Sequence, residues 1–105
     1  MRSNEEQRRA RVAAYLDLVA SDAADRPRAL AAAILARALR RPLEAAPAPL
    51  PFVEDEVRRV AANEIAAGAS ADVMAEIVYE ISSILVELRD RFPESPLERL
   101  LAVED

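Results

Sequence analysis

The side chains in this sequence that could do chemistry are carboxylates, arginines and serines, because histidine, cysteine and lysine are all missing. Histidine is the side chain most often used as a general base and as a transition-metal ligand. A serine nucleophile also needs a nearby base, and the single glycine cannot form a glycine-rich phosphate loop. We therefore expect a chain that is not an enzyme and that holds no metal ion and no cofactor.

Glu64 is the carboxylate whose place in the sequence is hardest to explain. It lies at helical spacing among apolar residues, namely Val53, Val57, Val60, Ala61 and Ala67. A buried carboxylate is costly unless an arginine or a metal ion compensates its charge. Glu64 could form a bundle-core site with Glu76 or Glu80, but carboxylate di-metal bundles also use a Glu-x-x-His motif, which this chain lacks. We favour the simpler interpretation that Glu64 reaches solvent or an arginine.

A second group of carboxylates follows one stripe of the helix expected after Ser70. The stripe contains no basic residue, and its members include Asp72, Glu76, Glu80 and Glu87. Such a stripe is commonly only the solvated face of a helix. Carboxylates four residues apart repel each other, however, and this cost keeps open a candidate acidic face that docks a basic partner.

Arginines gather at the end of the second expected helix, where they form a candidate basic patch of Arg37, Arg40 and Arg41. Three further arginines lie on the first helix, at Arg8, Arg9 and Arg11. Together the two clusters could contact phosphates. The alternative is that arginines at a helix C-terminus complement the helix dipole, while those on the first helix form a solvated face.

Residues 64–77 have the outline of a helix-turn-helix, a motif that reads DNA with its second helix. Here that second helix offers carboxylates where phosphates would lie, and neither arginine nor an amide that could read a base edge. We therefore do not expect nucleic acid to be the main partner.

Helices separated by turn residues must position these side chains. The spacing of Ser3 and Glu6 is that of a capping box, and Pro27 suits the first turn of a second helix. Gly68, the only glycine, suits the end of a third helix. We expect helices over residues 4–21, 26–40, 52–67 and 71–92. A second capping-box spacing at residues 95–98 predicts a short fifth helix.

The helix expected over residues 71–92 carries more apolar surface than one neighbour can cover. Four of its apolar positions alternate as in a coiled-coil seam: Ile77, Ile81, Ile84 and Leu88. A second, shallower apolar arc includes Tyr79 and Val86. Such a helix is either the central helix of a bundle or the seam of a dimer. We take these six residues as the candidate interface.

The alanine-rich composition, the single glycine and the absence of strand patterns predict an all-α fold. We expect one domain over residues 1–105, a small helical bundle of four main helices plus a short C-terminal helix. Two helical hairpins, over residues 1–41 and 52–92, are joined by a Pro-rich connector over residues 42–51. Residues 95–105 form the short C-terminal helix and tail.

The charge of the chain is divided unevenly. Residues 1–41 hold nine arginines and five acidic residues, a net charge of +4, whereas residues 42–105 hold five arginines and fourteen acidic residues, a net charge of −9. Such an asymmetry can create one basic and one acidic surface for partners. The longest apolar run, residues 29–36, is far too short to span a membrane, and no secretory signal pattern is present.

These observations favour a cytoplasmic protein without a membrane partner. Because every basic residue is arginine and alanine is abundant, a GC-rich bacterial coding sequence is expected. The leading hypothesis is a non-catalytic protein–protein interaction module, such as an adaptor, inhibitor or regulatory subunit, that binds another protein and forms a homodimer. The alternative is a nucleic-acid-associated regulator that uses the arginine clusters of the first two helices.

Overall fold

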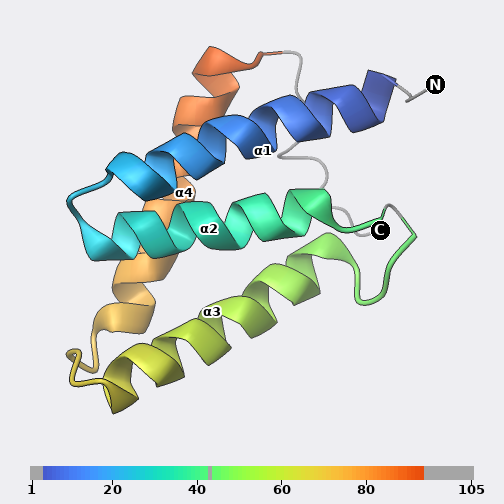
Figure 1. The fold of residues 1–105 in the computed structure, drawn as a ribbon. Helices are drawn as coiled ribbons and strands as arrows, with labels where there is room; N and C mark the ends of the chain where they lie inside the picture. The colour runs from blue at the N-terminus through green and yellow to red at the C-terminus, as the bar shows by residue number, and fades with distance from the viewer. Residues whose placement is uncertain (1–3, 43, 94–105) are drawn as a thin grey trace.

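The computed structural model describes residues 4–42 and 44–93, and over these residues it contains helices and no strand (Figure 1). The helices are α1 (Asn4–Asp22), α2 (Arg26–Arg40), α3 (Pro49–Ala66) and α4 (Val73–Arg91). The predicted all-α fold with four main helices is therefore confirmed. The short helix expected at residues 95–105 lies outside the described residues.

The helices form two layers (Figure 1). α1, α2 and α3 lie side by side in one layer, and α4 starts beside the end of α3 and crosses behind α2 and α1. α2 contacts each of the other three helices, whereas α1 packs mainly on α2. The central helix of the bundle is therefore α2. The sequence suggests that α4 is either this central helix or a dimer seam; α4 is not the central helix, but it packs on both α2 and α3 within the chain.

α2 can occupy the centre because its buried side chains are small or branched and cover more than half of its circumference. The buried residues are Ala31, Ala32, Ile34, Leu35, Ala36, Ala38 and Leu39. Alanine places little bulk between two helix backbones, so neighbouring helices can approach α2 closely from several sides. Ile34 and Leu35 are fully buried together with Leu16 of α1 and Ile77 and Ile84 of α4. The hydrophobic core is thus shared by both layers.

The turn between α3 and α4 is set by Gly68, as the sequence predicted. This glycine has a positive φ of 108°, a conformation that side chains with a Cβ disfavour. The Gly68 N–H donates to the Ile65 carbonyl at 3.0 Å, and the Ala69 N–H donates to the Glu64 carbonyl at 2.9 Å. These two bonds form a Schellman motif, which satisfies carbonyls that the end of α3 would otherwise leave unpaired.

Two helix starts differ from the sequence expectation. α3 begins at Pro49 rather than at residue 52, because prolines in a first helical turn lack only N–H groups that need no partner within the helix. α4 begins at Val73, two residues later than expected. Ser70 still organises this start, since its Oγ accepts a hydrogen bond from the Asp72 N–H at 3.1 Å.

Candidate interaction surface

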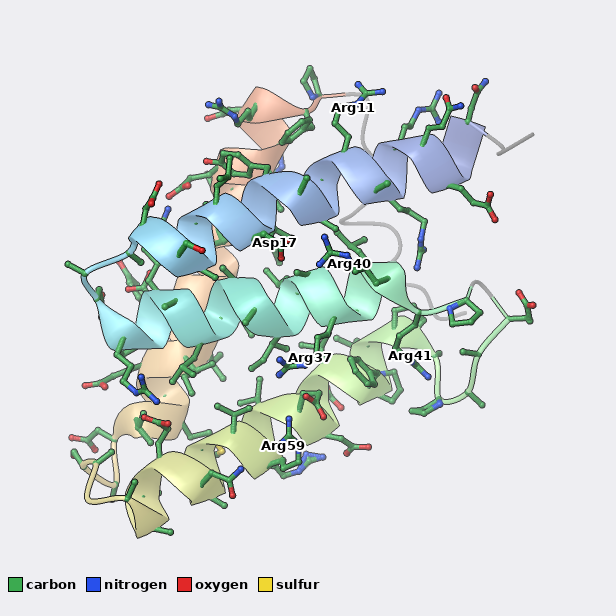
Figure 2. The ribbon with its side chains drawn as sticks, in the orientation of Figure 1. Arg11, Asp17, Arg37, Arg40, Arg41 and Arg59 are labelled. Carbon is green, nitrogen blue, oxygen red and sulfur yellow. The ribbon has the colours of Figure 1, made fainter. Side chains whose placement is uncertain are left out.

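The arginines of the candidate basic patch are each engaged within the chain (Figure 2). Arg37 donates to Glu56 of α3 at 2.9 Å, and Arg40 donates to Asp17 of α1 at 2.6 and 3.0 Å. The hydrogen bonds from Arg40 hold the pKa of Asp17 below its ordinary value. These two side chains, predicted as candidates for phosphate binding, therefore connect α2 to its neighbours.

The third member of that patch, Arg41, turns toward the connector. Its guanidinium lies 4.2 Å from the centre of the Phe52 ring and donates to the Pro47 carbonyl at 2.8 Å. The contact with the ring is a cation–π interaction. Arg41 thereby fixes the connector against the start of α3.

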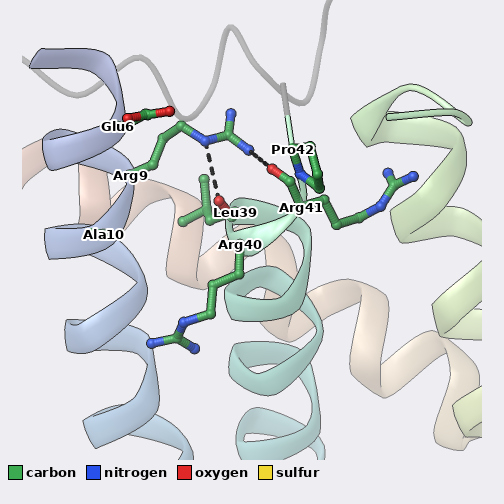
Figure 3. Close-up of a pocket in the computed structure, with 7 residues that line it drawn as sticks. All are labelled: Glu6, Arg9, Ala10, Leu39, Arg40, Arg41 and Pro42. Carbon is green, nitrogen blue, oxygen red and sulfur yellow. Dashed lines mark hydrogen bonds between the residues drawn. The ribbon is translucent and has the colours of Figure 1, made fainter. Parts of the chain in front are cut away.

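Arg9 of α1 has a role that the sequence analysis missed. Its guanidinium donates to the carbonyls of Leu39 at 3.1 Å and Arg41 at 3.0 Å, at the C-terminal end of α2 (Figure 3). Only 6% of Arg9 is exposed. The sequence did indicate this burial, because helical spacing places Arg9 on the same face as Val12 and Leu16. It is a buried cap for α2, rather than part of a solvated face.

A hollow of about 580 Å³ lies at this end of α2 and is lined mainly by charged and aliphatic residues (Figure 3). Its lining residues are Glu6, Arg9, Ala10, Leu39, Arg40, Arg41 and Pro42. Arg9, Arg40 and Arg41 all use their guanidinium groups for contacts within the fold. An anion entering the hollow would have to compete with these contacts.

Glu64 meets an arginine, as the favoured interpretation required. Arg26 at the start of α2 donates two parallel hydrogen bonds to its carboxylate, at 2.5 and 2.7 Å. These bonds lower the pKa of Glu64, and the carboxylate stays charged although its side chain is only 14% exposed. The partner could not be identified from sequence, because Arg26 and Glu64 are brought together only when α3 packs against α2.

The candidate acidic face of α4 divides into two parts. Arg28 of α2 donates to Glu87 at 2.7 and 2.8 Å and lies 3.7 Å from Glu80. These two carboxylates therefore help to attach α4 to α2. Asp72 and Glu76 are exposed, and no basic side chain within residues 4–42 and 44–93 forms an ion pair with either. The exposed acids Asp72 and Glu76 thus lie at the N-terminal end of α4, at its N-cap and in its first turn.

The candidate interface residues of α4 also divide. Ile77, Ile84 and Leu88 are buried in the core of the chain itself, and Ile81 is half-buried. The spacing that resembles a dimer seam thus reflects packing of α4 within its own chain. Tyr79 and Val86, by contrast, are 70% and 53% exposed. Of the six candidate interface residues, Tyr79 and Val86 are therefore the two whose side chains are exposed in this fold.

α4 presents a continuous uncharged surface that no other described helix covers. We call it the outer face; it consists of Met74, Ala75, Val78, Tyr79, Ser82 and Val86, all exposed. At 100° per residue these side chains span the arc from the edge of the buried stripe to its opposite side. Tyr79 and Val86 were predicted to belong here. Met74 and Val78 also belong to it, which the sequence could not show, because periodicity cannot tell which part of a wide apolar arc is covered.

The outer face adjoins an open hollow of about 480 Å³ between α4 and the start of α2. The residues lining the hollow are mostly acidic: Asp25, Pro27, Asp72, Ala75, Glu76, Tyr79 and Glu80. Ala75 and Tyr79 belong to both features. The apolar surface and the acidic surface are therefore continuous.

None of the four described helices combines the length and the apolar character that a membrane-spanning segment needs. Comparison with known proteins gives no match to a family model, to a curated protein or to a solved structure.

Proposed function

We propose that this chain is a non-catalytic protein–protein interaction module and that it binds its partner through the outer face of α4. The observation that supports this function is the group of large apolar side chains exposed together on one helix, with Tyr79, Val86, Val78 and Met74 each 45–70% exposed. Scattered exposed apolar residues are normal on a protein surface, but a contiguous group bordered by polar residues is typical of an interaction site.

The outer face belongs to a helix that is firmly attached on its other side. Val73, Ile77, Ile84 and Leu88 bury their side chains in the core. At the end of α4, the Phe92 ring lies 5.6 Å from that of Tyr15. A preorganised surface loses little conformational entropy when a partner binds, so more of the contact energy contributes to affinity.

The nucleic-acid alternative receives less support. Phosphate binding by the candidate basic patch would have to displace Glu56 from Arg37 and Asp17 from Arg40. The exposed charges beside the N-terminal part of the outer face, Asp72 and Glu76, are acidic and would repel phosphates, whereas Arg89 lies at its C-terminal end. The homodimer expected from sequence would have to use the same outer face, so a second copy competes with any other occupant of that face.

Capture from native-host lysate tests the proposed function with three baits. The first is the unaltered chain, the second carries Val78→Gln and Val86→Gln, and the third carries Leu18→Gln. Leu18 is a suitable control because it is 62% exposed on α1, away from the outer face. We expect one protein in stoichiometric amount with the unaltered and Leu18→Gln baits, and its loss from the α4 variant.

Equal capture by all three baits would show that the outer face is not the binding surface. Recovery of nucleic acid without a protein, detected by absorbance, would favour the alternative function instead. Thermal unfolding of each bait checks that the substitutions leave the fold intact.

A further inference from the structure

We propose that the occupant of the outer face is an amphipathic helix of another protein whose apolar stripe is flanked by arginine or lysine. This inference rests on the proposed function and adds the chemical class of the partner.

A helix fits the outer face better than an extended strand does. The face runs along α4 from residue 74 to residue 86, a length of about 18 Å. It offers side chains only, because the backbone groups of α4 are bonded within the helix, whereas strand addition needs an open sheet edge. No strand is present among residues 4–42 and 44–93. Ala75 and Ser82 are small and lie seven residues apart on this face, and small side chains let the backbone of a second helix approach closely.

The charge beside the outer face requires a basic partner. Asp72 and Glu76 follow the same edge of α4 as Tyr79, and neither forms an ion pair with a basic side chain in the described part of the chain. Carboxylates four residues apart on a helix repel each other. A cationic side chain placed between Asp72 and Glu76 would remove this repulsion, and an acidic one would increase it.

The acidic hollow has the composition expected for a receptor of a cationic side chain. Asp25, Asp72, Glu76 and Glu80 line it, and Tyr79 stands at its border with the outer face. A guanidinium or ammonium group in the hollow could contact Asp72 or Glu76 and the ring of Tyr79, whereas Glu80 already lies 3.7 Å from Arg28. In a partner helix whose leucines pack on the outer face, an arginine or lysine beside the leucine stripe would lie next to the hollow.

A second copy of this chain fits the same surface less well. In an antiparallel two-fold pair of α4 helices, the symmetry axis places the same edge of both helices side by side. On each copy this edge carries the exposed carboxylates of Asp72, Glu76 and Asp90, whereas Glu87 is already paired with Arg28 of its own chain. Each chain also has a net charge of −5, so the two copies repel at longer range. Like charges of this kind are a common means of excluding a wrong partner.

Titration of the isotope-labelled full chain with two synthetic peptides tests the inference by NMR. Both peptides are amphipathic helices with the same leucine stripe; one has arginines and the other glutamates on the flanks. We expect the arginine peptide to shift amide resonances along the outer face and to bind at least about tenfold more tightly than the glutamate peptide, with affinity that falls as salt is added. Asp72→Lys with Glu76→Lys should abolish this preference. The control, Glu54→Lys with Asp55→Lys, makes the same change of charge on exposed positions of α3 and should keep it.

Three outcomes would overturn the inference. They are the absence of outer-face shifts with the arginine peptide at millimolar concentration, equal binding of the two peptides, and dimerisation of the peptide-free chain through α4 in sedimentation measurements. If any of these occurs while lysate capture still depends on Val78 and Val86, the partner class is wrong and the interaction function stands. If capture is also independent of these residues, both proposals fail.

Discussion

α2 and α4 are both rich in apolar residues, yet the fold uses them differently. α2 buries seven of its fifteen residues, and each of its arginines contacts a group elsewhere in the chain. α4 is four residues longer but buries only four, and large apolar side chains remain on its outer face. A helix whose apolar surface is buried by other helices of its own chain has a structural role. A helix with apolar surface left over has capacity for a partner.

The arginines of α2 show how charge supports this difference. Arg40 reaches α1, Arg26 and Arg37 reach α3, and Arg28 reaches α4. Exposed ion pairs of this kind each contribute little to stability, typically below about 1 kcal/mol. Their arrangement around one helix nevertheless fixes which helix lies beside which. No described arginine forms an ion pair with Glu76 or Asp90 of α4 or with Asp72 just before it, and Asp72 and Glu76 lie beside the uncovered apolar surface.

The largest effects are expected in the shared core. Ile34→Ala in α2 and Ile84→Ala in α4 should each lower the free energy of unfolding by about 2–5 kcal/mol, because both side chains are fully buried and truncation leaves a cavity. Val86→Ala on the outer face should change it by less than about 0.5 kcal/mol. Urea denaturation of the three variants measures the difference. A large loss with Val86→Ala would mean that the outer face is covered within the chain.

The next effect concerns the end of α2. Arg9→Met keeps the length of the side chain but removes the donors to the Leu39 and Arg41 carbonyls. We expect a loss of about 1–3 kcal/mol, the usual cost of leaving buried polar groups unpaired. Arg11→Met, at an exposed position of the same helix, is the control and should have almost no effect. Equal stability of the two variants would show that Arg9 does not cap α2.

A smaller effect is expected where the chain turns from α3 into α4. Gly68→Ala should cost about 1–2 kcal/mol, because the positive φ of 108° places a Cβ in a disfavoured conformation. A Cβ at this position would meet no atom within 4 Å, so the cost is a property of the backbone alone. Chemical denaturation measures it, with Ala66→Gly inside α3 as a comparison. A Gly68→Ala variant as stable as the parent would contradict the left-handed turn.

The smallest effect is the dependence of stability on pH that the ion pairs create. Hydrogen bonds from arginine lower the pKa of Asp17, Glu56 and Glu64 in the folded chain. The unfolded chain therefore binds more protons at acid pH, and the contribution of these pairs is present above the ordinary carboxyl pKa of about 4. It should disappear gradually as the pH falls through the lowered pKa values of the folded chain.

Thermal unfolding between neutral and acid pH measures this dependence. The variant with Asp17→Asn, Glu56→Gln and Glu64→Gln should have a flatter pH profile than the parent. Asp72→Asn with Glu76→Gln should leave the profile unchanged, because these carboxylates lie outside the ion pairs of α2. If the pH profile became equally flat in both variants, the carboxylates paired with arginine would not differ from the exposed Asp72 and Glu76 in their contribution to stability.

Local signals in the sequence determined most of the helical structure. Alanine content, proline positions and Gly68 place four helices to within about three residues of their observed bounds, because capping and backbone conformation depend on neighbouring residues. Burial of Arg9 could also have been inferred from its spacing to Val12 and Leu16. The start of α3 could not have been inferred, since Pro49 and Pro51 are compatible with either a connector or a first helical turn.

Tertiary structure decided the features on which function depends. Hydrophobic periodicity shows how wide the apolar arc of α4 is. Which residues of that arc are buried depends on which helices pack against α4 and at what crossing angle. Packing of α2 against α4 buries Ile77 and Ile84 and leaves Val78, Tyr79 and Val86 exposed. The partners of Arg26, Arg28, Arg37 and Arg40 lie 19–59 residues away along the chain. The sequence by itself therefore determined the helices and the residue types on each face, and only the assembled fold decided which charges are neutralised and which apolar surface remains for a partner.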